Sequence, residues 1–153
     1  MRSLLGRCSL LTACLLLLFA HPGLALQTTD LAPPPDKVFH GEIHGTQNHT
    51  YVQVPFEVAA GVQRVTLTFS YTAREQHAAL DLGLLDPGEL RCWSGGNKSL
   101  LTVGVSDATP SCLPGRIPAG TWNVLIGVPN IRPGITSQYT LQIWFNSDGP
   151  GWR

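Results

Sequence analysis

The sequence predicts an all-β fold, an antiparallel β-sandwich of about seven or eight short strands. Three observations predict it. Short apolar runs with strand periodicity recur along the chain, turn-forming residues separate these runs, and no stretch of about ten residues combines a helical period with helix caps. The chain of 153 residues contains 16 Gly and 12 Pro. We interpret these residues as turn formers between strands. They do not indicate disorder, because the content of Val, Leu, Ile and aromatic residues is too high for a disordered chain.

Seven runs are predicted as strands. They cover residues 38–43, 50–58, 62–71, 80–85, 99–105, 121–128 and 138–145. The third run alternates most clearly, because its odd-numbered residues Val65, Leu67 and Phe69 are apolar while residues 64, 66 and 68 are polar. We expect the odd-numbered face to be buried and the even-numbered face, which includes Thr66, to be exposed to solvent.

The chain begins with the pattern of a secretory signal peptide. Arg2 and Arg7 provide positive charge, residues 8–20 are apolar, and small residues precede a predicted cleavage site after Ala25. An alternative is processing at Cys14, because residues 11–14 resemble a bacterial lipoprotein box. We therefore expect a secreted or periplasmic protein without a membrane span.

The rest of the chain is predicted to form one domain. Residues 26–36 are a proline-rich leader, and residues 37–146 contain all the predicted strands. Charged residues make up only 13% of the chain, and ten basic residues balance ten acidic ones. This composition excludes the basic surface that nucleic acid or an anionic membrane requires.

Cys92 and Cys112 are the cysteines that remain after removal of the signal peptide. Disulfides persist outside the cytoplasm. A bond between these two residues would close a loop of about 20 residues and stabilise the fold by about 3 kcal/mol on a chain-entropy estimate. We expect the pair to form, with two free thiols as the alternative.

His40, Glu42 and His44 are the candidate metal ligands. On a strand, alternation places all three on one face, and two histidines with one carboxylate are a known metal-binding set. The competing interpretation is that they form the solvent side of a first strand, which we favour because no pattern nearby supplies partners to orient the ligands.

The four tryptophans fall into two groups. Trp122 and Trp144 alternate with apolar neighbours in strands and are predicted to fill the core. Trp93 and Trp152 lie in loop-like sequence and are the candidate ligand-binding residues, because sugar-binding sandwiches use exposed aromatic faces. A Gly-x-Ser-x-Gly nucleophile motif is absent from the sequence, and no catalytic residues or cofactor are predicted.

A series of segments, taken in order, carries a resemblance to a known family. They are residues 51–58, 61–65, 80–87, 91–96, 108–110, 113–115 and 118–127. Their order and spacing resemble the N-terminal β-sandwich of secreted metallohydrolases of the carbaryl-hydrolase type, the CehA/McbA family. The resemblance covers residues 37–153 and implies a sandwich that is jelly-roll-like or similar to pre-peptidase C-terminal domains. In that family we would expect glycine at position 92 and an apolar or aromatic residue at position 112.

The resemblance also implies a partner. In the family, a metal-dependent hydrolase domain of the polymerase and histidinol phosphatase (PHP) type follows a connector that resembles residues 148–152. The chain would then be a non-catalytic accessory domain, and residues 147–153 a truncated linker to a missing PHP domain. Divalent metals are expected only in that catalytic domain, since no position here matches a family metal ligand. The alternative function is a stand-alone extracellular module that binds a glycan or another cell-surface ligand.

Overall fold

The computed structural model describes residues 32–151 and contains eight strands. The predicted signal peptide, most of the leader and Trp152 lie outside the described residues. The strands are β1 (Lys37–His44), β2 (Thr50–Val58), β3 (Arg64–Tyr71), β4 (Ala79–Leu85), β5 (Leu90–Gly95), β6 (Leu100–Gly104), β7 (Gly120–Asn130) and β8 (Thr136–Phe145). Two short 3₁₀ turns, η1 (Gly45–Gln47) and η2 (Arg74–Gln76), follow β1 and β3.

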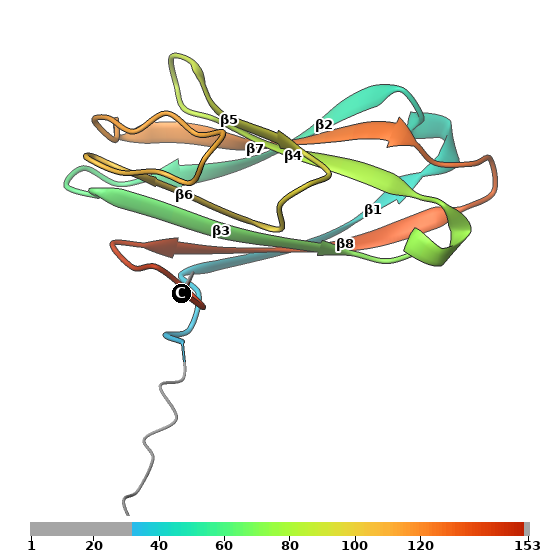
Figure 1. The fold of residues 1–153 in the computed structure, drawn as a ribbon, viewed down its shortest axis with the longest axis horizontal. Helices are drawn as coiled ribbons and strands as arrows, with labels where there is room; N and C mark the ends of the chain where they lie inside the picture. The colour runs from blue at the N-terminus through green and yellow to red at the C-terminus, as the bar shows by residue number, and fades with distance from the viewer. Residues whose placement is uncertain (1–31, 152–153) are drawn as a thin grey trace, which may run out of the picture. The chain divides into compact units, whose positions relative to one another are not determined.

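The strands form two four-stranded antiparallel sheets that face each other (Figure 1). One sheet has the order β1-β8-β3-β6 and the other β2-β7-β4-β5. The pairing is nested: β1 pairs with β8, β2 with β7, β3 with β6 and β4 with β5, and successive pairs alternate between the sheets. Eight strands wound in this way form a jelly roll. The predicted all-β antiparallel sandwich is therefore confirmed.

The seven predicted strands are all present, and their ends differ from the predictions by no more than about two residues. The prediction missed β5. Turn sequences flank β5 closely on both sides, namely residues 86–88 and 94–97, so its residues resemble a loop. Pairing with β4 makes it a strand, with register shifts at Leu82/Gly83 and at Leu84/Leu85.

The inner faces of both sheets supply one hydrophobic core. Val65, Leu67 and Phe69 of β3 belong to it as predicted, and Trp122 of β7 is completely buried there. The prediction that the even-numbered face of β3 is exposed to solvent is wrong at Thr66, which is fully buried. Its hydroxyl donates to the Ser147 carbonyl at 2.8 Å, so the segment after β8 covers this part of the outer face.

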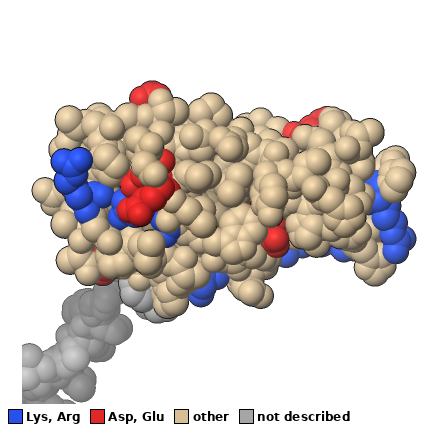
Figure 2. Space-filling view, turned by 90° about the horizontal axis from the view of Figure 1, so that it is seen from above, with Lys and Arg blue, Asp and Glu red and all other residues tan. Residues whose placement is uncertain are grey.

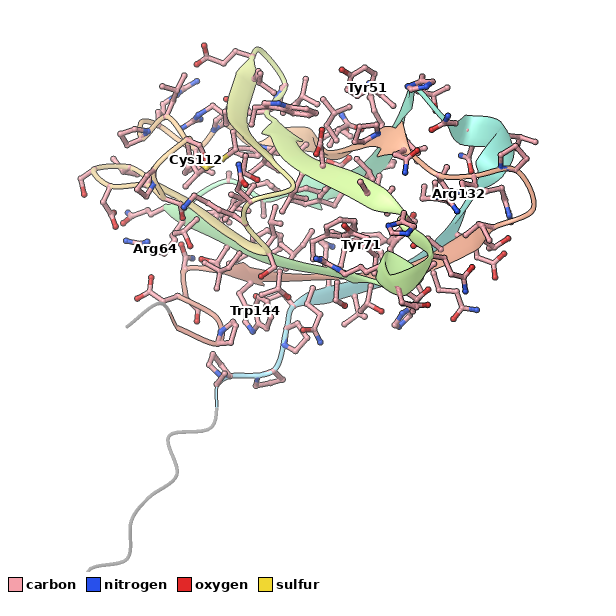
Figure 3. All side chains as sticks on the ribbon, turned by 45° about the vertical axis from the view of Figure 1, so that its right-hand side comes forward. Tyr51, Arg64, Tyr71, Cys112, Arg132 and Trp144 are labelled. Carbon is pink, nitrogen blue, oxygen red and sulfur yellow. A yellow bond between two sulfur atoms is a disulfide. The ribbon has the colours of Figure 1, made fainter. Side chains whose placement is uncertain are left out.

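Trp144 is buried, but the prediction that it fills the core is wrong. It lies outside the central core cluster, and it projects from β8 on the side opposite to its core neighbour Ile143. Its indole N–H donates to the Pro33 carbonyl at 2.7 Å, and Gly149 packs against the ring. Figure 3 shows Trp144 on the side of the sandwich where residues 32–36, the described part of the leader, enter β1. Segments at both ends of the described chain therefore bury it.

One end of the sandwich is held by a disulfide and a buried arginine. Cys92 of β5 is bonded to Cys112, which confirms the expected pair. Beside it, Arg91 donates to the Leu113 carbonyl at 2.9 Å and forms an ion pair of 2.9 Å with Asp86. These contacts fix the long β6–β7 connection against the end of β5.

Candidate functional site

Two aromatic side chains stand exposed on the outer face of the β2-β7-β4-β5 sheet. Tyr51 of β2 exposes 66% of its surface, and Trp93 of β5 exposes 36%. Their ring centroids are 5.9 Å apart and the ring planes are inclined by 58°. Figure 3 shows Tyr51 on the side of the sandwich opposite to Trp144. The two rings come from the two edge strands of this sheet, β2 and β5. Side chains on β7 and β4, which lie between them, would be expected to keep the rings apart.

Two glycines in those middle strands provide that reason. A Cβ atom at Gly83 of β4 would lie only 2.7 Å from Cε3 of Trp93. A Cβ atom at Gly127 of β7 would lie 3.0 Å from Cη2 of Trp93 and 3.4 Å from Cε1 of Tyr51. Because neither glycine has a side chain, the indole can lie close to the backbone of β4 and β7 and approach Tyr51. We call Tyr51 and Trp93, with Gly83 and Gly127 beneath them, the aromatic platform.

Asp81 of β4 adds a carboxylate to this site. It pairs with Gly127 in the sheet, and its Cβ would lie 3.1 Å from a Cβ at that glycine. Asp81 lines a hollow of about 200 Å³ together with Tyr51, Gly127 and His49. The side chain is half-buried, and desolvation raises the pKa of its carboxyl above the ordinary value.

The surface around the platform carries little charge. Figure 2 looks onto this sheet and shows mostly side chains that are neither acidic nor basic. A hollow of about 200 Å³ is smaller than the roughly 300–1,000 Å³ of sites for drug-sized ligands. It suits one small group of a larger ligand whose other parts lie across the open platform.

The candidate metal ligands lie away from the platform, on the other sheet. His40, Glu42 and His44 alternate along β1 on its exposed face, as the solvent-side interpretation predicts. His40 contacts Thr140, and the His44 ring lies 3.7 Å from the Glu42 carboxylate. Within residues 32–151, no group of three or more His, Cys, Asp or Glu side chains is arranged to hold a metal ion.

Of the two predicted ligand-binding tryptophans, Trp93 lies on the platform and Trp152 lies outside the described residues. Sequence reasoning missed Tyr51 as a site residue. The signal was present, since Tyr51 is the only aromatic residue on the outward-facing positions of β2, where Gln53, Pro55 and Glu57 follow it. Asp81 could not be distinguished from the other carboxylates without the register that pairs it with Gly127.

The fold and site define a class of protein: an eight-stranded jelly-roll sandwich with an exposed aromatic platform on one sheet. A scan of protein-family models finds no match to the chain, and a search of curated proteins finds no matching sequence. Membership of the CehA/McbA family therefore stays a prediction. The described part of the chain contains no helix with the length and apolar character needed to span a bilayer.

Proposed function

We propose that this chain is a secreted, non-catalytic β-sandwich that binds a glycan on its aromatic platform. The observation that carries the proposal is the exposed pair of Tyr51 and Trp93, held 5.9 Å apart above two glycines. Exposed aromatic rings are costly to hydrate, and a ligand that covers them recovers apolar burial. The C–H face of a pyranose ring is apolar and flat enough to stack on such rings.

Polar groups around the platform suit the hydroxyl groups of a sugar. Gln53 is exposed on β2 in the same row as Trp93, because Gln53 pairs with Leu125, Leu125 with Gly83, and Gly83 with Trp93. Asp81 lies on the opposite side of Gly127 from Tyr51, across the hollow. A ring stacked on the platform therefore has hydrogen-bonding groups within reach along its edge. The disulfide supports a location outside the cytoplasm.

Binding of soluble hexasaccharides tests this proposal. Glucose, N-acetylglucosamine and mannose oligomers would be titrated into the protein while tryptophan fluorescence and heat are recorded. Trp93→Ala and Tyr51→Ala should each weaken binding by about tenfold, by analogy with the about 1–3 kcal/mol that one aromatic side chain contributes when a nucleobase stacks on it. Leu113→Ala is the matched control, because Leu113 is an exposed apolar residue outside the platform. Absence of binding to every oligomer tried, including a glucosamine oligomer, would contradict the proposal.

A second candidate function is the accessory domain of a PHP-type metallohydrolase, as the resemblance implies. The observation that favours it is the docked segment after β8. Asp148 forms a 3.1 Å ion pair with Arg64, Asn146 accepts from the Gln63 amide at 2.7 Å, and Gly149 packs on Trp144. A connector held in this way would give a following domain a defined direction relative to the sandwich. Co-purification of the chain with a separately expressed PHP domain tests this candidate, and failure to associate would contradict it.

A further inference from the structure

Asp81 differs from the other aspartates that the structure describes. Asp86 and Arg91 form an ion pair, Arg64 contacts both Asp107 and Asp148, and Asp36 accepts a hydrogen bond from the Phe145 amide. Among residues 32–151, Asp81 has neither a hydrogen-bond partner nor an ion-pair partner. Yet it is half-buried, so the fold partly dehydrates this carboxylate without compensating it. A half-buried carboxylate without a protein partner is free to accept hydrogen bonds from a ligand.

The two aromatic rings of the platform also make no cation–π contact with a described lysine or arginine. Elsewhere in the fold, Arg74 stacks on Tyr71, Lys37 lies over Phe145 and Arg91 lies over Trp122. Within the described residues, no lysine or arginine lies over Tyr51 or Trp93. The negative faces of these two rings are therefore free to attract a positive group from outside the chain.

The charge of the hollow has one sign. Asp81 is the only acidic residue that lines it, and no lysine or arginine does. The other titratable side chains among the lining residues are His49 and Tyr51. A carboxylate beside two aromatic rings favours a small organic cation over an anion, because charge and ring faces act in the same direction.

We propose that this hollow takes a protonated amine, so that the preferred ligand of the platform is a glycan containing amino sugar residues. The proposal rests on the glycan-binding function and names its substrate class. In the complex, the sugar ring covers Tyr51 and Trp93, and its ammonium group donates hydrogen bonds to the Asp81 carboxylate. The amine supplies the positive partner that Asp81 lacks among residues 32–151.

Three oligomers of equal length test the proposal: glucosamine, N-acetylglucosamine and glucose hexamers. Titrations at about pH 6 keep the amine protonated, because that pH lies below the roughly 7.7 typical of an α-amino group. We expect the glucosamine oligomer to bind about tenfold more tightly than the glucose oligomer, as for a charge-assisted hydrogen bond. Asp81→Asn, which keeps the shape and removes the charge, should abolish this preference, so that the glucosamine and glucose oligomers bind this variant within about twofold of each other.

The outcomes separate the two proposals. Equal binding of all three oligomers, or an amine preference that survives in Asp81→Asn, overturns the amino sugar proposal while the glycan-binding function stands. If none of the three oligomers binds, both the amino sugar proposal and the glycan-binding function are overturned. Repeating the titrations with His49→Gln removes a second titratable group from the hollow, and the amine preference should persist in that variant. Its loss there would assign the selectivity to His49 and overturn the role of Asp81.

Discussion

The indole of Trp93 lies against the bare backbone of Gly83, its cross-strand partner, where a Cβ atom would come within 2.7 Å of Cε3. This relationship sets the position of the aromatic platform. Trp93 can lean from the edge strand β5 towards Tyr51 only because the adjacent position on β4 has no side chain. The two residues are ten positions apart in the chain but form one feature of the surface.

Gly83→Ala should therefore displace the Trp93 ring. Gly83 has no positive φ angle, so alanine fits the backbone and only the clash with the indole acts. We expect a changed near-UV circular dichroism spectrum, greater quenching of tryptophan by acrylamide, and weaker ligand binding. Gly88→Ala is the control, since the nearest atom to its Cβ would lie at 3.5 Å. An unchanged Trp93 environment in Gly83→Ala would contradict the close packing.

Asp81→Asn should make the fold more stable at neutral pH while it weakens binding of the glucosamine oligomer. Burial raises the folded-state pKa of Asp81. The folded state therefore holds the proton more tightly than the unfolded chain, and this contribution to stability is present below about pH 4 and lost as pH rises through the folded-state pKa. Asparagine carries no charge to dehydrate. Urea unfolding at about pH 3 and pH 7 should show a gain in Asp81→Asn, relative to the wild type, that is larger at pH 7. An equal difference at both pH values would refute this.

Loss of the disulfide should lower the free energy of unfolding. Cys92 and Cys112 are separated by 20 positions, and closing such a loop stabilises a fold by about 3 kcal/mol on the entropy estimate. The double variant Cys92→Ala, Cys112→Ala should melt at a clearly lower temperature than the oxidised protein. Reduction of the wild type should produce a similar fall, and the oxidised native protein should show no reactive thiol at these two positions. A melting temperature insensitive to reduction would show that the bond adds no stability.

Trp144→Phe should loosen the segment after β8. The substitution removes the N–H that donates to the Pro33 carbonyl and part of the surface on which Gly149 packs. We expect a loss of about 1–2 kcal/mol in stability and faster hydrogen exchange in residues 146–151. Trp122→Phe provides the control, because Trp122 lies in the central core. That variant should destabilise the whole domain without a selective effect on this segment. Equal exchange of residues 146–151 in both variants would show that Trp144 does not hold them.

Much of the fold could be predicted because β-strand periodicity is local. The apolar alternation of Val65, Leu67 and Phe69 was sufficient to assign β3 and its buried face. The strand β5 was missed because its strand character comes from pairing with β4, while its own sequence is bounded by turns. Thr66 and Trp144 were misjudged for a related reason. Alternation identifies which residues share a face, but it does not indicate that a distant segment covers that face.

The sequence by itself determined the all-β class, seven of the eight strands and the two cysteines that pair, because each depends on local pattern or on the composition of the chain. The candidate site was decided only by tertiary structure. Tyr51, Asp81 and Trp93 come from three strands, and they meet because β2, β7, β4 and β5 lie side by side in that order. The physical reason is register. Strand pairing brings Gly127 between Tyr51 and Asp81, and Gly83 beside Trp93, and only these two bare positions allow the rings and the carboxylate to converge.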